Sequence, residues 1–331
     1  MSGCISAPEN RFSKSGFRDR FRPPSDGCTT LKGSFADVLY CTAGDTPIMK
    51  IAIASGKGGT GKTTIATNLA SSIARVGQNV QYLDCDVEEP NGHIFLKPDI
   101  EETRDVTIGV PQVDEKKCNG CGKCGQLCQY SAIICIKDTV LTFEELCHAC
   151  GGCMAICPEG AITEKQRKIG VTEFGKADGI YFGHGKLNIG AVQTPTLIRH
   201  LKRRAMDDAV VVIDAPPGTS CPVIEAVKGS DLVLLVTEPT PFGLNDLELA
   251  VEMVRALELP FAVAINRCDI GDDRVVRYCR QEDIEIVLKM PNDRLIAEAY
   301  STGIKIIDAL PGYEEKFSQL YERIRARVVA G

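Results

Sequence analysis

A glycine-rich run between residues 56 and 64 has the residue types of a phosphate-binding loop. It consists of Gly56, Lys57, Gly58, Gly59, Thr60, Gly61, Lys62, Thr63 and Thr64. The run matches the pattern G-x-x-x-x-G-K-[ST], in which glycines let backbone N–H groups converge on phosphate oxygens. Lys62 is expected to reach the β- and γ-phosphates, and the Thr63 hydroxyl to join the coordination of Mg²⁺. An ordinary glycine-rich turn is the alternative, but an apolar run precedes this loop and a helical pattern follows it.

Eight cysteines form two sets with the same spacing, C-x2-C-x2-C-x3-C. The first set is Cys118, Cys121, Cys124 and Cys128, and the second is Cys147, Cys150, Cys153 and Cys157. Ala132 and Ile133 follow the first set at the offset at which Ala161 and Ile162 follow the second, which indicates an internal duplication. Three cysteines at this spacing can bind three irons of one cluster, while the fourth points toward another cluster. Zinc is the alternative, but zinc usually takes two C-x2-C pairs separated by a longer stretch.

The segments that must position these residues are apolar runs alternating with amphipathic stretches. We predict buried strands at residues 51–54, 80–83, 210–213, 232–236 and 262–265, and helices at 63–75, 196–204, 244–257 and 293–301. Runs rich in Val, Ile and Leu are typical of parallel strands that are covered on both faces. The predicted fold class is therefore α/β with a mostly parallel sheet.

Three aspartates stand at the ends of predicted strands. Asp84 and Asp86 follow the strand at 80–83, and Asp214 follows the strand at 210–213. A single acidic residue at such a place is often a helix cap or a turn former. Three of them beside a phosphate loop favour a role in the nucleotide site instead.

The pattern of residues divides the chain into three parts. Residues 110–166 are dense in Cys and Gly and interrupt the α/β rhythm, so we predict an inserted domain there. Residues 49–109 and 167–331 then form the nucleotide-binding domain. Residues 1–48 contain several arginines and no sustained period, which indicates a disordered extension or an over-called start with Met49 as the initiator. A transit peptide is the alternative for residues 1–48, although their acidic residues do not fit that pattern.

From residue 49 onward the chain resembles the deviant Walker A ATPases, the P-loop NTPase family that includes MinD, ParA, Mrp-type cluster carriers and the nitrogenase iron protein. The early lysine of the loop, Lys57, carries much of this resemblance through the motif K-G-G-x-G-K-T. The resemblance implies an ATP-dependent homodimer in which Lys57 of one subunit reaches the nucleotide of the other. A solvated loop lysine is the alternative interpretation of Lys57.

The same resemblance implies roles for residues outside the loop. Asp86 would orient the attacking water, Asp84 would support the Mg²⁺ shell, and Asp214 would hold Mg²⁺ through water. In the segment D-x-P-P-G-T the N–H of Gly218 would sense the γ-phosphate. Asn266 would contact adenine, and the loop with Pro291, Asn292 and Asp293 would close over the base. The predicted catalytic residues are Lys57, Lys62, Asp86 and Asp214.

The cysteine-rich insert resembles a bacterial ferredoxin with two [4Fe–4S] clusters, a small α+β domain. The resemblance implies a crossed pair of ligand sets. One cluster would be held by Cys118, Cys121, Cys124 and Cys157, and the other by Cys147, Cys150, Cys153 and Cys128. Cys85 and Cys221 lie next to the aspartate segments, where each is either a redox-sensitive thiol or a small buried side chain.

The composition limits the classes of function. The 331 residues include 16 cysteines, carry a formal net charge of −6 and contain no run apolar enough to span a bilayer or to serve as a signal peptide. We therefore expect reduced thiols, a cytoplasmic location, no stable membrane insertion and no nucleic-acid partner. The leading hypothesis is an ATPase that gates electron transfer from two clusters to an unidentified redox or metallocluster partner. The alternatives are a cluster carrier that assembles metalloproteins and a redox-sensing regulatory ATPase of the MinD or ParA kind.

Overall fold

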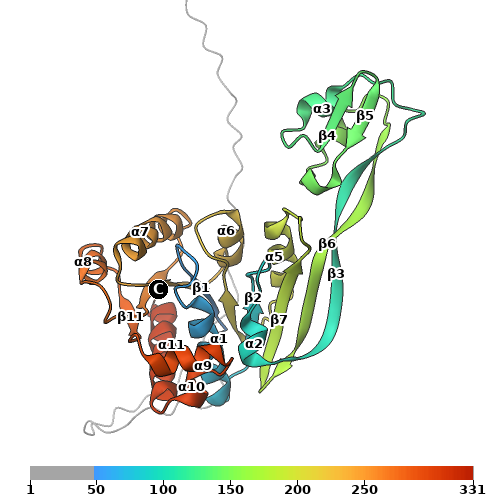
Figure 1. Cartoon of the computed structure of the whole chain (residues 1–331). Helices are drawn as coiled ribbons and strands as arrows, with labels where there is room; N and C mark the ends of the chain where they lie inside the picture. The colour runs from blue at the N-terminus through green and yellow to red at the C-terminus, as the bar shows by residue number, and fades with distance from the viewer. Residues whose placement is uncertain (1–47, 331) are drawn as a thin grey trace, which may run out of the picture. The chain divides into compact units, whose positions relative to one another are not determined.

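A nine-stranded sheet organises the residues that the structure, a computed structural model, describes, namely 48–330 (Figure 1). The expectation for residues 1–48 falls almost entirely outside this range. The strand order is β11-β10-β9-β1-β8-β2-β7-β6-β3, and neighbouring strands from β11 to β7 are parallel. These parallel strands are β1 (Lys50–Ala54), β2 (Val80–Asp84), β7 (Ile180–Leu187), β8 (Val210–Asp214), β9 (Leu232–Thr237), β10 (Phe261–Ile265) and β11 (Ile286–Lys289). The prediction of a mostly parallel α/β sheet is confirmed.

Helices cover both faces of this sheet because successive side chains of each strand point to opposite faces. In β1, Ile51 and Ile53 belong to one buried hydrophobic cluster, and Ala52 and Ala54 belong to another. The helices that contribute to the first cluster are α1 (Lys62–Arg75), α2 (Gly92–Leu96), α10 (Ile306–Ala309) and α11 (Tyr313–Ala330), with α9 (Arg294–Ser301) packed at its edge. The helices of the second cluster are α5 (Thr194–Lys202), α6 (Cys221–Val227), α7 (Pro241–Ala256) and α8 (Arg274–Gln281).

The predicted elements of the nucleotide-binding part are confirmed with small shifts at their ends. The five predicted strands correspond to β1, β2, β8, β9 and β10, and the four predicted helices correspond to α1, α5, α7 and α9. The final helix α11 buries Phe317, Leu320, Tyr321 and Ile324, so its apolar face packs into the core. No helix within residues 48–330 is both long enough and apolar enough to cross a membrane.

Two long antiparallel strands complete the sheet and were not predicted. They are β3 (Asp99–Val113) and β6 (Ile162–Ala177), which pair along nearly their whole length. Much of β3 is exposed and charged, so it has no apolar run that would reveal a strand. The predicted insert boundaries at residues 110 and 166 fall inside these two strands.

The cysteine-rich segment lies between β3 and β6 and forms a small substructure of its own, which we call the cysteine module (residues 114–161). It contains α3 (Lys123–Leu127), β4 (Ile133–Ile136), β5 (Thr139–Thr142), the 3₁₀ turn η1 (Glu144–Leu146) and α4 (Gly152–Ile156). Strands β4 and β5 form a separate antiparallel pair. Figure 1 shows β3 and β6 continuing from the sheet into this module. The module therefore interrupts an antiparallel hairpin.

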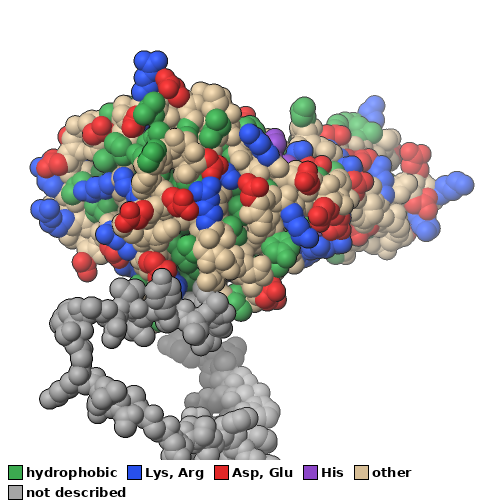
Figure 2. All heavy atoms as spheres, turned by 90° about the horizontal axis from the view of Figure 1, so that it is seen from below, with side chains coloured by type: hydrophobic (Ala, Val, Ile, Leu, Met, Phe, Trp, Pro, Cys, Tyr) green, Lys and Arg blue, Asp and Glu red, His purple; other side chains and the backbone are tan. Residues whose placement is uncertain are grey.

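The surface that is visible in Figure 2 carries acidic and basic side chains in alternation. Among the described residues, exposed charges are often paired, as in the contacts of Arg75 with Glu314, Arg327 with Glu285 and Arg255 with Glu282. This face therefore presents no extended field of a single sign.

Candidate functional site

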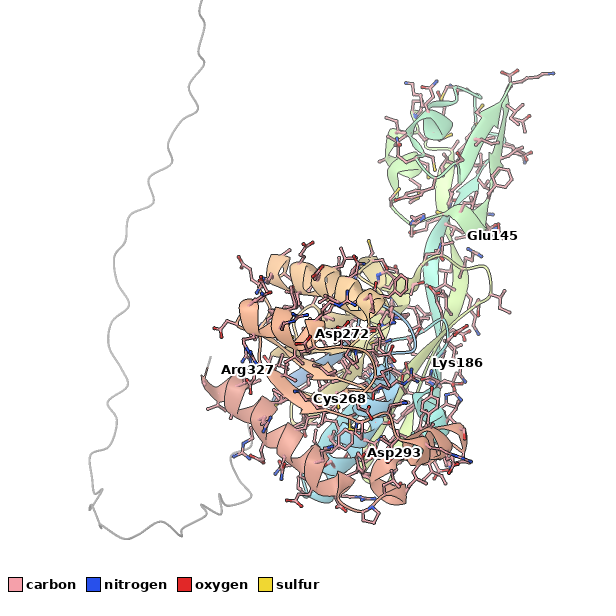
Figure 3. The ribbon with its side chains drawn as sticks, turned by 60° about the vertical axis from the view of Figure 1, so that its left-hand side comes forward. Glu145, Lys186, Cys268, Asp272, Asp293 and Arg327 are labelled. Atoms are coloured by element: carbon pink, nitrogen blue, oxygen red, sulfur yellow. The ribbon has the colours of Figure 1, made fainter. Side chains whose placement is uncertain are left out.

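A cavity of about 480 Å³ opens beside the phosphate loop. Eleven of the predicted nucleotide-site residues line it: Gly58, Gly59, Gly61, Lys62, Thr63, Thr64, Asp86, Asn266, Pro291, Asn292 and Asp293. The loop joins β1 to α1, and Pro291 and Asp293 lie between β11 and α9. Asp293, labelled in Figure 3, caps α9 by accepting a hydrogen bond from the N–H of Leu295 at 2.8 Å. The structure thus gathers residues that lie far apart in the sequence around one cavity.

The shape of the phosphate loop depends on glycine at particular positions. Gly61, the residue before α1, has φ +95°, a backbone conformation that residues other than glycine rarely adopt. At Gly56 a Cβ atom would lie 2.1 Å from the carbonyl oxygen of Asp246, so a side chain there would push the loop away from α7. No acidic residue lies in the first turn of α1, which leaves the positive helix end available to an anion.

Two buried aspartates lie side by side beneath the loop. Asp84 and Asp214 are in register at the ends of β2 and β8, and both are almost completely buried. Burial raises the pKa of both carboxyl groups, and the charge of Asp214 adds to the effect on Asp84. The Asp214 pKa is held down in turn by the Thr63 hydroxyl and the positive charge of Lys62. The two acids therefore need a cation close by to be ionised together.

The partners of these aspartates distinguish their roles. Asp84 accepts hydrogen bonds from the backbone N–H groups of Asp86, Asn91 and Gly92 at 3.1, 3.1 and 2.8 Å, so it fixes the segment after β2. One oxygen of Asp214 accepts a hydrogen bond from the Tyr82 hydroxyl at 3.0 Å, while its other oxygen is buried and has no hydrogen-bond partner among residues 48–330. An orphaned carboxylate oxygen near the Thr63 hydroxyl fits the oxygen ligands that Mg²⁺ prefers.

Asp86 faces the cavity from the segment after β2. Burial, together with the charge of Asp214, raises its pKa to about 6, although Lys62 acts in the opposite direction. Asp86 is thus a carboxylate close to the phosphate loop that changes its charge near neutral pH.

Lys57 does not line the cavity. Its Nζ lies 3.4 Å from Oε2 of Glu238, and the other oxygen of Glu238 accepts a hydrogen bond from Arg267 at 2.8 Å. About a third of the Lys57 side chain is exposed, whereas Glu238 is nearly buried. Glu238, just after β9, and Arg267, just after β10, were not singled out in the sequence. An acidic residue at the end of a predicted buried strand was the available signal for Glu238.

Gly218, Asn266 and Thr60, which were predicted to bind the nucleotide, also have defined surroundings within the chain. The N–H of Gly218 donates to the carbonyl of Ser55 at 3.0 Å, so it is occupied within the chain. The amide nitrogen of Asn266 donates to the carbonyl of Thr60 at 2.9 Å and braces the phosphate loop. Thr60 is buried rather than exposed to the cavity. Residues that line the cavity without having been predicted include Glu89, Asn91, Arg267 and Tyr300.

The eight cysteines of the two sequence sets line two separate hollows in the module. One hollow contains Cys118, Cys121, Cys124 and Cys157, and the other contains Cys128, Cys147, Cys150 and Cys153. The fourth cysteine of each sequence set ends a short helix, Cys128 after α3 and Cys157 after α4, and so turns toward the other set. The division of the cysteines between the hollows is the same as the division between the two ligand sets that the ferredoxin resemblance implies.

The donor chemistry of both hollows fits clusters whose thiolates each bind a different iron. Backbone N–H groups of Ala149 and Ala161 donate to the sulfurs of Cys147 and Cys157 at 3.4 Å, as hydrogen bonds to cluster thiolates do. Within residues 48–330, no three His, Cys, Asp or Glu side chains lie close enough to share a single metal ion.

The two other cysteines with a suggested role lie in different environments. Cys85 is fully buried, and burial raises the pKa of its thiol well above the ordinary value. Cys221 is exposed at the first residue of α6. Cys85 therefore behaves as a small core residue rather than as a reactive thiol.

Comparison with known proteins identifies the class of protein that this fold and cavity define. A family model described as the CobQ/CobB/MinD/ParA nucleotide binding domain matches residues 51–306. The chain belongs to this family of P-loop ATPases.

Individual relatives agree with the family. An uncharacterized protein of Methanocaldococcus jannaschii is 32% identical over 259 residues, which cover 77% of this chain and 90% of the relative. An iron-sulfur cluster carrier protein of Pyrococcus horikoshii is 26% identical over 273 residues, 78% of this chain and 79% of the relative. The septum site-determining protein MinD of Pyrococcus horikoshii, solved with Mg-ADP, has a similar fold with a TM-score of 0.53 at 19% identity, covering 84% of this chain and 96% of that one.

Proposed function

We propose that the chain binds ATP with Mg²⁺ in the cavity beside the phosphate loop and hydrolyses it as a homodimer. The loop N–H groups and Lys62 hold the phosphates, and Thr63 and Asp214 serve the metal ion. Asp86 faces the cavity and orients the attacking water. Lys57 leaves Glu238 and crosses to the nucleotide of the partner, where its positive charge stabilises the transferring phosphoryl group. The unpartnered oxygen of Asp214 and the cavity lining support this assignment.

The cysteine module is proposed to be a ferredoxin-like domain that holds two [4Fe–4S] clusters as resident groups. The observation that carries this proposal is the separation of the eight cysteines into two hollows of four, each with three cysteines from one set and one from the other. When bound, such clusters supply one-electron redox chemistry, in which one is oxidised by one electron as the acceptor centre of a partner protein is reduced by one. The chain's part is to hold each group by four thiolates against a mostly apolar lining and to set its surroundings by hydrogen bonds.

Together these two sites make ATP-gated electron transfer the best supported function. An external one-electron donor protein loads the module, and the nucleotide state of the dimer decides when the electron leaves for the acceptor. Hydrolysis of ATP to ADP and phosphate resets the dimer. The closeness of the segment after β2 to the nucleotide cavity supports gating, because this segment contains Asp86 and changes its surroundings with the nucleotide.

A cluster carrier is the second candidate, and the names of relatives favour it. The relatives from Pyrococcus horikoshii and Bacillus subtilis are called iron-sulfur cluster carrier proteins. A carrier must release its cluster. Release is easier when exposed cysteines of two subunits share the cluster than when four cysteines of one chain hold it. After Cys157 the cysteines of this chain are Cys221, Cys268 and Cys279, which form no closely spaced pair. The cysteine arrangement therefore favours resident clusters.

One anaerobic experiment separates the candidates. Iron and sulfide per chain are measured first, and cluster potentials are then recorded with ADP and with a slowly hydrolysed ATP analogue. A potential that depends on the nucleotide supports gated electron transfer, and transfer of iron to an apo-protein supports the carrier. Clusters whose redox state alters the ATPase rate without passing electrons support a redox-sensing regulatory ATPase. Protein that stays colourless and free of iron after reconstitution refutes all three.

A further inference from the structure

A buried glutamine joins the nucleotide-binding part of the chain to one of the two cysteine hollows. Gln193 precedes α5 and is 4% exposed. Its Nε2 donates a hydrogen bond to the carbonyl oxygen of Cys147 at 2.6 Å, and its Oε1 accepts one from the N–H of Val192 at 3.2 Å. Both ends of the side-chain amide are thus satisfied, which fixes its orientation. Gln193 therefore holds the backbone of a predicted cluster ligand from outside the module.

The next residue reaches in the opposite direction. The hydroxyl of Thr194 donates to Oε1 of Glu88 at 2.7 Å. Glu88 is two residues beyond Asp86, which faces the nucleotide cavity. Residues 86–89 are called the switch segment below. Gln193 and Thr194, which are adjacent in the chain, thus contact Cys147 on one side and the switch segment on the other.

Apolar packing follows the same route independently. Val87 of the switch segment is buried, and its carbonyl accepts a hydrogen bond from the N–H of Leu187, at the end of β7, at 2.8 Å. Val87, Leu197 of α5 and Cys147 all belong to one buried hydrophobic cluster. Because protein interiors are closely packed, this shared cluster is a second physical connection between the switch segment, α5 and Cys147.

The module is tied to the sheet on this same side. Arg167 of β6 donates a hydrogen bond to the carbonyl of Glu144 at 2.8 Å, in the turn η1 that leads directly into Cys147. Figure 3 labels Glu145, the next residue of this turn, where the module meets β3 and β6. The loop that begins at Cys147 is therefore held both by β6 and by Gln193.

Among the described residues, no hydrogen bond joins the other hollow to α5 or to the switch segment. Cys124 belongs to a small separate cluster with Ile133 and Ile162. The loop around Cys121 is held within the module, where Asn119 accepts the N–H of Cys121 at 3.1 Å and donates to Glu159 at 3.0 Å. The two hollows thus differ in their coupling to the nucleotide site.

We infer that Gln193 and Thr194 are positioning residues that carry the nucleotide state of the switch segment to the cluster held by Cys147, Cys150, Cys153 and Cys128, and not to the other cluster. This inference rests on the proposed function. Hydrogen bonds and backbone placement near cluster ligands tune the reduction potential. Movement of the switch segment pulls on Thr194, shifts Gln193 and alters its hydrogen bond to Cys147. The nucleotide state therefore controls the reduction potential of the cluster held by Cys147, Cys150, Cys153 and Cys128, and this control regulates electron transfer.

The test uses the full-length chain from which the other cluster, assigned to Cys118, Cys121, Cys124 and Cys157, is removed by Cys118→Ser and Cys121→Ser. In this background the potential of the remaining cluster is measured with ADP and with a slowly hydrolysed ATP analogue. Thr194→Val keeps the shape of the side chain and removes the hydroxyl, whereas Thr194→Ser keeps the hydroxyl and serves as the matched control. We expect the nucleotide-dependent shift in potential to be lost with Val and retained with Ser, at equal iron content.

A second variant protects the test against local misfolding. Gln193→Leu removes the donor to Cys147 and is expected to abolish the nucleotide-dependent shift, as Thr194→Val does. Asn119→Leu is made in the chain that keeps both clusters. It is expected to leave intact the nucleotide-dependent shift in the potential of the cluster that Cys147 binds. A shift that persists in both Thr194→Val and Gln193→Leu overturns the inference, as does an equal nucleotide response of the two clusters. If the parent protein binds clusters whose potentials do not change with the nucleotide, the proposed gating itself is wrong. This outcome is distinct from a shift that persists in the two variants and from an equal response of the two clusters.

Discussion

Replacing Lys57 by alanine separates hydrolysis from binding and tests whether the lysine acts across a dimer. In the described chain Lys57 contacts Glu238 at 3.4 Å and does not line the nucleotide cavity. A third of its side chain is exposed, so loss of this ion pair is expected to cost at most about 1 kcal/mol of stability. Nucleotide affinity should change by no more than about twofold, because no cavity contact is removed. Turnover should fall by about 10³–10⁵, the contribution of a cation supplied in trans.

Mixing two inactive variants distinguishes action across the dimer from action within one subunit. Asp86→Asn removes the carboxylate that faces the cavity but leaves Lys57 in place. In a heterodimer with Lys57→Ala, the nucleotide of the Lys57→Ala subunit has its own Asp86 and receives Lys57 from its partner. At equal mixing, half of the dimers are mixed and each has one complete site, so about a quarter of wild-type turnover should return.

The assay is steady-state release of phosphate at saturating ATP, with nucleotide affinity from titration calorimetry and folding from thermal denaturation. Lys57→Arg is the matched control, because it keeps the charge on a side chain of similar length. Recovery of activity in the mixture requires that Lys57 of one subunit act at the nucleotide of the other subunit. If the mixture is as inactive as its components while heterodimers are demonstrably present, the lysine acts within its own subunit and the reasoning is wrong.

Three further predictions address other parts of the structure. The pKa of Asp86 is raised to about 6, and we propose that its carboxylate form orients the attacking water. We therefore expect kcat/KM for ATP to fall as the pH drops through 6, and we expect this decline to be absent from the residual activity of Asp86→Asn. Cys157→Ser should reduce iron from about eight to about four per chain by anaerobic analysis, because a cluster of four irons loses one of its ligands; retention of eight would contradict the ligand assignment. Phe317→Ala should lower the free energy of unfolding in urea by about 3–5 kcal/mol, since Phe317 is fully buried between α11 and the sheet, whereas the exposed Val329→Ala should change it little.

The fold of the nucleotide-binding part was predictable because its central strands are buried on both faces. Residues such as Val210–Asp214 and Leu232–Thr237 are buried along their whole length, so a continuous apolar run identifies them. Strand β7 escapes this signal because it contains Gly183, His184, Gly185 and Lys186. At Gly185 a Cβ atom would lie 2.7 Å from a methyl group of Val87, so glycine is required by close packing that the sequence does not reveal.

The candidate site was predictable where a motif defines it and not where distant residues meet. The phosphate-loop motif identifies many residues that line the cavity, and the cysteine spacing identifies the eight cysteines that line the two hollows. Glu238 contacts both Lys57 and Arg267, and these contacts join three loops that lie far apart in the sequence. Likewise, nothing local to Gly218 shows that its N–H is bonded to Ser55, or that the amide of Asn266 braces Thr60.

The cysteine module begins and ends at neighbouring backbone positions. Val113 pairs with Ile162, and the N–H of Asp114 donates to the carbonyl of Ala161 at 2.7 Å. A short turn in place of residues 114–161 would therefore close β3 and β6 into an ordinary hairpin without changing the order of any strand. The arrangement of the nine-stranded sheet thus does not depend on the module, which can be removed or exchanged at a single hairpin tip.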